Sequence, residues 1–469
     1  MPFLTQLNRW AAERPADLAV EVGDDRLSYA DLAGQAHARL GSTPPRSVLC
    51  LPNSTEFVIA LTAAVSGSRS CAVLDASWPP EQRLAVEQRL RQLPTGPPMP
   101  EGIIAARERL ADGPDDTIFL YGFTSGTAST PKAFSRTRGS WPLQASVDFF
   151  EVTERDRTLV PGAFSAGLNL YALMESMHAG AAVFALPHFD VGLALSCLRD
   201  RGMTRLVAVP SALKLIAERG RESGIDATTL TAIVSGGAKL DPSTRQLLRD
   251  WAPQAIIYEY YGAAELSFVT ASVHRPGEAE ETGTTNVGRP FPGVVVSVRD
   301  EAGHDLKPAQ AGTIFVKSPL VSRGYAWGDD GQAFRQDGEW TTVGDQGFLA
   351  ADGTLHHLGR HGDMIVTAGH NVYPQQVEAA LERVDGVTAV VVTGIPDAER
   401  GRRIVAAVHG EHRVEPAALR AAAMRLPAPA RPRGYFRLDE LPLTGAGKLS
   451  RAMLRQWIDE GDPRARPLD

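Results

Sequence analysis

The sequence contains few cysteines and no long apolar run. Its cysteines, Cys50, Cys71 and Cys197, are widely separated and odd in number, which argues against a disulfide framework and is typical of a reducing compartment. No apolar stretch approaches the length of a transmembrane helix. The first residues also lack the charged leader and apolar core of a signal peptide. We therefore expect a cytoplasmic protein that does not enter a membrane.

Positive charge is also scarce. Lysine and arginine number 48 against 55 aspartates and glutamates, and the formal net charge of −7 comes without any basic block. Such a chain is a poor candidate for a nucleic-acid-binding protein. The neighbouring histidines His356, His357 and His361 lack the spacing of helical metal ligands and have no supporting cysteines, so we expect no metal site there.

The middle of the chain alternates short apolar runs with amphipathic segments. The runs RLVAVP, TAIVSGGA and AIIYEYYG indicate strands, and the segments between them indicate helices. One predicted helix begins at a Ser211 cap and stops at Gly220, and the next begins at an Asp241 cap with Pro242 in its first turn. This order predicts an α/β fold with doubly wound, mostly parallel sheets, in which ligands bind beyond the carboxyl ends of the strands.

Three loops rich in small residues follow predicted strands. They are YGFTSGTASTPKAFSR (121–136), SGGAKL (235–240) and YGAAEL (261–266). Because the strand ends are equivalent, we expect the loops to form one composite site. Amides and hydroxyls around Gly126 suit phosphate oxygens, and Lys132 adds positive charge. The alternative is a plain Ser/Thr surface loop, which is common.

The texture changes after about residue 280. Short β-like runs separated by turn residues, including Asp352-Gly353, predict hairpins and a small β-barrel-like part. A helix that begins at Pro374 and the strand VTAVVVTGI follow. We therefore expect a large N-terminal domain, residues 1–360, and a small mobile α+β C-terminal domain, residues 361–469.

The first loop resembles the phosphate loop of the adenylate-forming superfamily, T-S-G-T-T-G-x-P-K-G, with departures at Ala128, Ser129 and Ala133. This superfamily includes acyl-CoA ligases, aryl-acid ligases and the adenylation domains of peptide synthetases. Further segments follow in the family's order: SGGAKL resembles its adenine loop, YYGAAE its Y-G-x-T-E, VGD its T-G-D, GRHGDMI its hinge, and PLTGAGKLSR its P-x-T-x-x-G-K-x-x-R. Ala264 and Val343 each replace a family threonine. The resemblance covers nearly the whole chain.

The resemblance implies a set of site residues. The residues that would bind ATP are Thr124, Ser125, Gly126, Thr127, Ala128, Lys132, Gly236, Gly237, Ala238, Tyr261, Gly262, Asp345, Arg360 and Lys448. Those implied to be catalytic are Lys448, Glu265 and Thr127, with Glu265 holding Mg²⁺. Tyr261 would stack on adenine and Asp345 would accept the ribose hydroxyls. Gly362 would be the hinge and Gly369 would line the pantetheine tunnel.

The substrate is an acid that the sequence identifies only by class. Ser165 follows Phe164, where amino-acid-activating relatives usually have an aspartate for the ammonium group, so an acid without an α-amino group is expected. The implied pocket consists of Phe164, Ser165, Gly167, Ser235 and Ala263. Its small, apolar surroundings favour an apolar acyl or aryl group. The alternative is that these residues only pack the core.

Three functions are compatible with these segments. The first is an ATP-dependent ligase that forms an acyl-adenylate and passes the acyl group to a pantetheine thiol, with CoA as the preferred acceptor. The second is a stand-alone adenylating enzyme that loads a carrier protein or an amine. The third is a degenerate, non-catalytic nucleotide-binding homologue. Such a protein would have no need to keep every charged group of the family pattern, as this sequence does. The expected assembly is a monomer or a homodimer.

Overall fold

A computed structural model describes residues 3–94, 110–124, 131–278, 285–329, 331, 334–360, 364–410, 414–443 and 449–468 of the 469-residue chain. The chain divides into two compact units. The first comprises Met1–Glu281, Gly288–Val296 and Val316–Val343, and the second comprises Thr282–Val287, Ser297–Phe315 and Gly344–Asp469. The expected domain boundary after Arg360 stays a prediction. None of the described helices is both long and apolar enough to cross a membrane.

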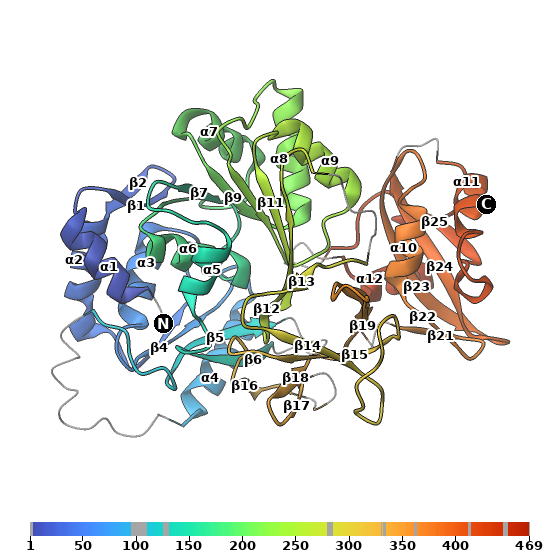
Figure 1. Ribbon diagram of the computed structural model, residues 1–469, viewed down its shortest axis with the longest axis horizontal. Coiled ribbons are helices and arrows are strands. Elements are labelled where there is room, and N and C mark those ends of the chain that lie inside the picture. The colour runs from blue at the N-terminus through green and yellow to red at the C-terminus, as the bar shows by residue number, and fades with distance from the viewer. Residues whose placement is uncertain are drawn as a thin grey trace. The chain divides into compact units, whose positions relative to one another are not determined.

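The first unit contains a nine-stranded sheet in the order β13-β12-β11-β10-β9-β7-β8-β1-β2 (Figure 1). Its strands are β1 (Leu18–Val22), β2 (Asp25–Ser28), β7 (Arg157–Val160), β8 (Ala182–Ala185), β9 (Arg205–Ala208), β10 (Ala232–Ser235), β11 (Ile256–Ala263), β12 (Ser267–His274) and β13 (Arg289–Pro290). Neighbours from β1 to β11 pair in parallel, whereas β2, β12 and β13 pair antiparallel. The predicted α/β fold is confirmed.

Helices cover both faces of this sheet. One face packs against α7 (Val191–Arg201), α8 (Pro210–Glu222) and α9 (Pro242–Trp251) in a shared apolar core (Figure 1). The opposite face packs against α6 (Gly167–Ala179), beside α5 (Leu143–Phe149) and α1 (Leu4–Glu13). Because both faces are covered, the parallel strands read as continuous apolar runs rather than alternating ones.

Two helix boundaries test the sequence prediction. The Asp241 cap of α9 is confirmed, because its Oδ1 accepts the Thr244 N–H at 2.8 Å. The Ser211 cap and Gly220 stop of α8 are wrong: Pro210 is the first residue of the helix, and α8 continues to Glu222. Gly220 serves packing instead, since a Cβ there would lie 2.6 Å from the Trp251 Nε1.

The first unit also contains a five-stranded sheet in the order β16-β6-β5-β4-β3. Its strands are β3 (Arg46–Leu49), β4 (Ser70–Val73), β5 (Ile118–Thr124), β6 (Lys132–Thr137) and β16 (Gly324–Trp327). The β5–β6 pair is an antiparallel hairpin. The predicted phosphate loop therefore belongs to a different sheet from the loops after β10 and β11. The expected composite site would therefore draw on the ends of two sheets.

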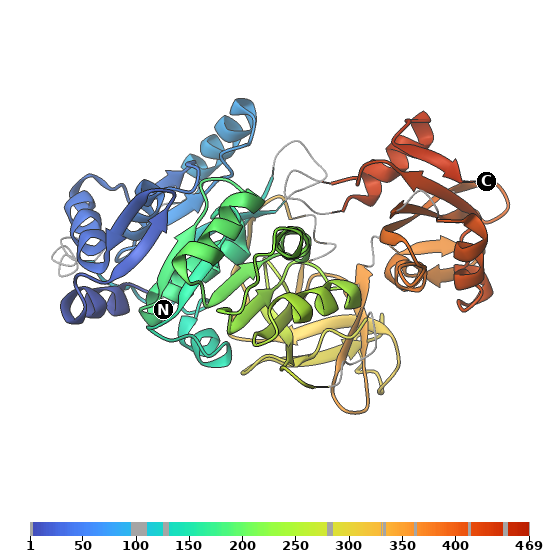
Figure 2. The same cartoon turned by 90° about the horizontal axis from the view of Figure 1, so that it is seen from above.

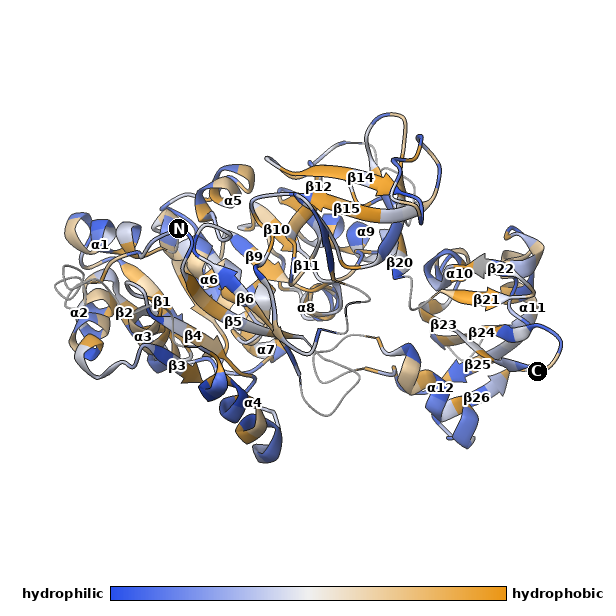
Figure 3. Ribbon diagram, turned by 90° about the horizontal axis from the view of Figure 1, so that it is seen from below, coloured by the Kyte–Doolittle hydropathy of each residue, from blue (hydrophilic) through white to orange (hydrophobic). Residues whose placement is uncertain are grey.

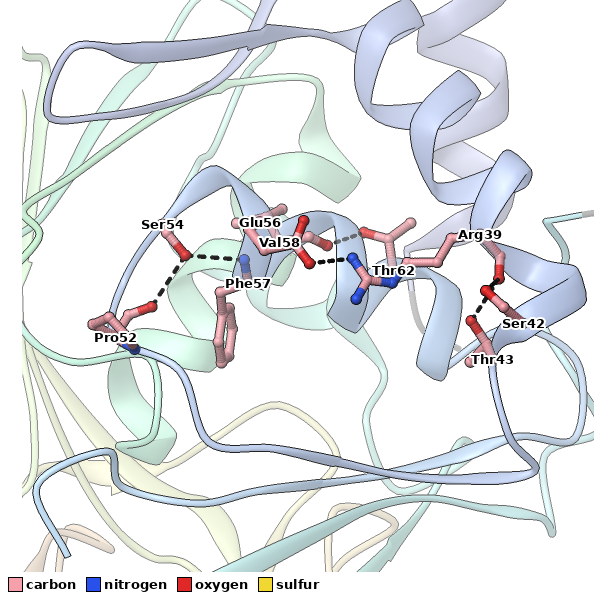
Figure 4. Close-up of polar contacts among 9 residues, drawn as sticks. All are labelled: Arg39, Ser42, Thr43, Pro52, Ser54, Glu56, Phe57, Val58 and Thr62. Atoms are coloured by element: carbon pink, nitrogen blue, oxygen red, sulfur yellow. Dashed lines mark hydrogen bonds and ion pairs between the residues drawn. The ribbon is translucent and has the colours of Figure 1, made fainter.

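Helix α2 (Tyr29–Arg39) and a short 3₁₀ turn, Leu40–Ser42, connect β2 of the first sheet to β3. Helix α3 (Thr55–Ala64) lies between β3 and β4, and α4 (Pro80–Gln92) follows β4. The Ser54 hydroxyl caps α3 by accepting the Phe57 N–H, and Arg39 pairs with Glu56 (Figure 4). Helix α4 carries mostly hydrophilic colours, since it buries little beyond Val86 and Leu90 (Figure 3).

Antiparallel strands follow, as the turn residues predict. They are β14 (Val295–Arg299), β15 (Gly312–Lys317), β17 (Arg335–Asp337), β18 (Trp340–Thr342), β19 (Asp345–Leu349) and β20 (Leu355–Arg360). The predicted turn between β19 and β20 is confirmed: Gly353 has a φ of +86°, and Asp352 Oδ1 accepts the Thr354 N–H at 3.0 Å.

The last part of the second unit contains a four-stranded sheet, β23-β24-β25-β26, and a short hairpin, β21–β22. Its elements are β21 (Ile365–Thr367), β22 (His370–Val372), α10 (Pro374–Leu381), β23 (Val387–Asp397), β24 (Gly401–Gly410), α11 (Pro416–Ala423), a 3₁₀ turn (Ala428–Ala430), β25 (Gly434–Leu438), α12 (Arg451–Glu460) and β26 (Ala465–Leu468). Val390 and Val392 pack on the α10 side and Val391 on the α12 side, so helices cover both faces (Figure 2).

Candidate functional site

The predicted phosphate loop is carried by the β5–β6 hairpin. Thr124, the last residue of β5, pairs with Lys132, the first residue of β6. The loop residues between Thr124 and Pro131, which include the predicted Ser125, Gly126, Thr127 and Ala128, lie outside the described residues. The Trp327 indole Nε1 donates to the Pro131 carbonyl at 2.9 Å, which ties the end of this segment to β16.

One face of β6 brings Lys132 to a tyrosine. Side chains alternate along a strand, so residues 132, 134 and 136 share a face. Tyr325 of β16 pairs with Phe134, and the Lys132 Nζ lies 5.8 Å from the centroid of the Tyr325 ring. This distance is within the range of a cation–π contact. Gly122 stands opposite Phe134, and a Cβ there would lie 2.3 Å from the phenylalanine Cζ, so only glycine leaves room for this ring.

Glu265 reaches the same tyrosine from the other sheet. It lies in the turn between β11 and β12 and is 6% exposed. The Tyr325 hydroxyl donates to Glu265 Oε1, and the Ser322 N–H donates to the Glu265 carbonyl at 2.7 Å. Lys132 and Glu265, which come from distant segments, therefore share Tyr325 as a neighbour. Sequence reasoning missed Tyr325, because only the β6–β16 pairing brings it here.

A buried arginine supports the Glu265 turn through hydrogen bonds to backbone carbonyls. Arg136 of β6 is 1% exposed, and its Nη2 donates to the Ala264 carbonyl at 2.6 Å. Its Nη1 donates to the Leu320 carbonyl. Burial lowers the pKa of the Arg136 guanidinium to about 10, and the negative charge of Glu265 opposes that effect. The only signal in the sequence is an arginine inside a strand that is otherwise buried.

The predicted adenine loop follows β10, and its two glycines have different causes. A Cβ at Gly236 would lie 2.4 Å from Tyr260 Cζ, so the Gly236 backbone packs directly against the Tyr260 ring. Gly237 has a φ of +86°, in the left-handed region that favours glycine. Ala238 is exposed, as is Gly237. The loop is therefore shaped by its own protein contacts whether or not a purine lies against it.

Glu259, which sequence reasoning missed, holds the far end of that loop. Its carboxylate accepts the Leu240 N–H at 2.9 Å and the Lys239 ammonium at 3.0 Å. Burial opposes ionisation of Glu259, but the nearby His274, the charge of Lys239 and the Leu240 N–H outweigh it. The pKa of this carboxyl therefore lies below its ordinary value.

The end of β11 contains the predicted adenine-stacking residue, Tyr261, which follows Tyr260. Tyr260 packs in an aromatic cluster, with its ring centroid 4.6 Å from that of Phe268. Alternation turns the next residue, Tyr261, toward the opposite face, where it is half-buried. The strand register shifts at Gly262, and a Cβ there would lie 1.9 Å from the Ser267 carbonyl oxygen.

The residues of the predicted acid pocket differ in their surroundings. Phe164 is fully buried: Asn53 Oδ1 accepts its N–H at 2.8 Å, and its ring centroid lies 5.3 Å from that of Phe57. Ser165 is half-buried, and Gly167 is the exposed first residue of α6. Ala263, the last residue of β11, is half-buried.

Ser235, at the end of β10, is the remaining residue of that pocket. It is fully buried, and its hydroxyl has no hydrogen-bond partner within the described ranges. A buried hydroxyl without a partner is unfavourable, so Ser235 offers a hydrogen bond at the predicted pocket.

Two predicted nucleotide residues meet in the second unit. Asp345 begins β19 and pairs with Arg360 at the end of β20. The Arg360 Nε lies 3.3 Å from Asp345 Oδ1, and the His357 Nε2 lies 3.5 Å from Oδ2. Asp345 is 4% exposed, and these two basic neighbours hold its buried carboxylate in place.

The predicted hinge Gly362 and catalytic Lys448 lie outside the described residues. The chain on both sides of the Lys448 segment is anchored: Leu443 forms a β-bridge with Leu449, and the Ser450 N–H donates to the Pro442 carbonyl at 2.7 Å. Arg451 follows and donates to Glu378 Oε2 at 2.7 Å.

Gly369, predicted at the pantetheine tunnel, lies in the turn of the β21–β22 hairpin. Ala368 and Gly369 have φ values of +48° and +79°, which is typical of a two-residue hairpin turn. A Cβ at Gly369 would meet no atom within 4 Å. The positive φ that this turn requires therefore accounts for Gly369, and no steric crowding restricts the position to glycine.

The donor set limits which metal could bind. Within the described ranges, no three histidine, cysteine, aspartate or glutamate side chains are grouped to hold an ion. A single buried carboxylate, Glu265, fits an ion that takes one protein carboxylate and completes its coordination with phosphates and water, as Mg²⁺ does.

Comparison with known proteins identifies two family models along the chain. The model described as AMP-binding enzyme matches residues 85–326, and the model described as AMP-binding enzyme C-terminal domain matches residues 376–448. The first match contains the phosphate-loop hairpin, the adenine loop and the Glu265 turn. The second ends at Lys448.

Individual relatives support the same assignment. The chain is 29% identical to the uncharacterized acyl-CoA ligase YhfT of Bacillus subtilis, over 96% of this chain and 97% of that protein. It is 33% identical to the 2-succinylbenzoate–CoA ligase of Geobacillus kaustophilus, over 72% of this chain and 68% of that protein. The crystal structure of ATP-bound MatB from Rhodopseudomonas palustris has the same fold, with a TM-score of 0.82, 23% identity, and coverage of 98% of this chain and 100% of that chain.

Proposed function

Because the chain belongs to the AMP-binding enzyme family, we propose that it is an ATP-dependent, AMP-forming acid–thiol ligase that joins a carboxylic acid to CoA. The observation that carries this proposal is the convergence of Lys132 and Glu265 on Tyr325. A phosphate-loop cation and a buried carboxylate then share one neighbourhood, as a triphosphate with its metal requires.

The proposed reaction has two steps. A carboxylate oxygen attacks the α-phosphorus of ATP, and the bond from that phosphorus to the oxygen that bridges to the β-phosphate breaks. The products of this step are the acyl-adenylate and pyrophosphate. The CoA sulfur then attacks the acyl carbonyl carbon, AMP leaves, and the thiol proton passes to solvent. Both reactants of the first step are anionic, so the main task of the protein is to stabilise and position charge.

Each proposed role matches a residue type in its setting. Lys132 and the loop before it hold the phosphates that leave, while Asp345 accepts the ribose hydroxyls. Glu265 holds Mg²⁺, which when bound neutralises phosphate charge. Lys448 bridges the carboxylate and the α-phosphate in the first step. Gly362 is the hinge between the two steps.

The acid is proposed to lack an α-amino group. Ser165 offers no charge for an ammonium group, and Phe164 beside it is part of the apolar core. The relative named 2-succinylbenzoate–CoA ligase has, by its name, a substrate without an amino group. An apolar acyl or aryl acid is the proposed substrate class, and the buried Ser235 hydroxyl adds one hydrogen bond. A carrier-protein pantetheine is the alternative acceptor, because it presents the same thiol.

ATP–pyrophosphate exchange over a panel of acids tests the proposal. We expect exchange with aryl or alkyl acids, little with their α-amino counterparts, and a thioester when CoA is added. Glu265→Gln should lower exchange by about 100-fold or more. Glu339→Gln, an exposed carboxylate paired with Lys317, is the control and should have no effect. Absence of exchange with every acid would refute a ligase, and a thioester only on a carrier protein would refute CoA as acceptor.

A further inference from the structure

Arg136 is a buried charged side chain near the end of β6. Its hydrogen-bond partners are backbone carbonyls of Ser140, Leu320 and Ala264 rather than carboxylates. Burying a guanidinium in this way costs several kcal/mol more than burying an apolar side chain of similar length, by roughly the desolvation cost of an ion. Core packing alone therefore does not call for arginine at this position.

Two of these three carbonyls, those of Ala264 and Leu320, belong to the two segments that hold Glu265. Ala264 immediately precedes Glu265 in the β11–β12 turn. Leu320 lies two residues before Ser322, whose N–H donates to the Glu265 carbonyl at 2.7 Å. One guanidinium thus fixes both sides of the Glu265 backbone. The planar fork of arginine suits this bridge, and the compact ammonium of lysine does not.

The same strand carries the phosphate-loop lysine. Lys132 and Arg136 lie on one face of β6, on either side of Phe134, and Tyr325 pairs with Phe134 from β16. The Tyr325 hydroxyl donates to the Glu265 carboxylate. Arg136 and Tyr325 therefore connect the strand that begins at Lys132 with the backbone and the side chain of Glu265.

We propose that Arg136 is a positioning residue, which fixes the Glu265 turn relative to Lys132 so that both groups meet one Mg²⁺–triphosphate. This inference rests on the proposed function.

The test measures binding rather than turnover. Calorimetry on the full chain gives the dissociation constants of Mg²⁺–ATP and of AMP, which lacks the β- and γ-phosphates. We expect Arg136→Met to weaken Mg²⁺–ATP binding by about 10- to 100-fold and AMP binding by less than about threefold. Arg136→Lys should restore less than half of the loss, because charge without the fork does not bridge two carbonyls.

Arg138→Met is the matched control. Arg138 is also fully buried, has a pKa lowered to about 10 by burial, and donates to the carbonyls of Val65 and Arg69 at 2.9 and 2.7 Å. It makes none of the contacts to the Glu265 turn, so its loss should lower the melting temperature without changing the ratio of the two dissociation constants. Tyr325→Phe provides a second variant should Arg136→Met fail to fold, and it should also weaken Mg²⁺–ATP selectively.

The outcomes separate the two proposals. If the wild type binds Mg²⁺–ATP and Arg136→Met and Tyr325→Phe leave the ratio unchanged, the positioning role is refuted and the proposed function stands. An equal loss of both ligands in Arg136→Met would likewise refute it, since that is what a general structural defect produces. If the wild type does not bind Mg²⁺–ATP, both proposals fail.

Discussion

Asp345 and Arg360 face each other across the β19–β20 hairpin, with the Arg360 Nε 3.3 Å from Asp345 Oδ1. This pair holds a buried carboxylate ready to accept hydrogen bonds. Asp345→Asn should weaken AMP binding by about 10- to 100-fold, because hydrogen bonds to a charged acceptor are the stronger ones. Calorimetry with AMP measures it. Asp352→Asn, in the turn of the same hairpin, should leave AMP affinity unchanged, and an Asp345→Asn affinity within twofold of wild type would contradict a ribose role.

The adenine loop includes Gly236, whose backbone packs directly against the Tyr260 ring. Gly236→Ala should destabilise the protein by about 1–3 kcal/mol, because the new Cβ would overlap Tyr260. Urea unfolding measures the loss. Gly34→Ala in α2, where a Cβ meets no atom within 4 Å, should instead raise stability by about 0.5–1 kcal/mol.

A double-mutant cycle with Tyr260→Leu identifies the cause. The smaller side chain makes room for the Cβ, so the combined loss should fall short of the sum by more than about 0.5 kcal/mol. Simple additivity would show that crowding by Tyr260 is not the reason for glycine at position 236.

Glu259 should make stability depend on pH. Its pKa is depressed on folding, so its contribution is complete above the ordinary value of 4.5 and is lost as the pH falls below it. Glu259→Gln should cost about 1.5–3 kcal/mol at pH 7, and the difference from wild type should shrink at pH 4. Urea unfolding at the two pH values tests this. A difference that does not change with pH would contradict it, and Glu13→Gln, in an exposed pair with Arg9, should have no effect at either pH.

Lys448 should separate the two half-reactions. Lys448→Ala is expected to abolish ATP–pyrophosphate exchange, because no other cation is proposed to bridge the two anions. Thioester formation from a supplied acyl-adenylate should stay mostly intact. Lys317→Ala, which removes an exposed lysine, controls for the general loss of charge. Equal loss of both steps would contradict a role confined to the first step.

Local patterns in the sequence predict the centre of the fold well. Strands β9, β10 and β11 appear as apolar runs, and the Asp241-Pro242 start of α9 has a single local meaning. The α8 boundaries were wrong because tertiary packing decides them: Gly220 is retained to fit Trp251, and the helix continues past it.

The supports of the site were beyond local reasoning. Arg136 and Ala264 are 128 positions apart, and Tyr325 and Glu265 are 60 apart, so neither contact has a periodicity to reveal it. The assignment of β5 to its own sheet is likewise a matter of long-range pairing. Ordered motifs indicated Lys132 and Glu265, whereas the residues that hold them are visible only in three dimensions.

The indole of Trp327 makes the chain its own optical probe. It bonds the Pro131 carbonyl at 2.9 Å, and its ring centroid lies 6.0 Å from that of Phe123, so it touches the chain both before and after the phosphate loop. Ligand capture there should change the emission of this indole without any attached dye. The chain has 7 tryptophans, and subtracting the spectrum of Trp327→Phe would isolate its signal and time the arrival of nucleotide in a stopped-flow instrument.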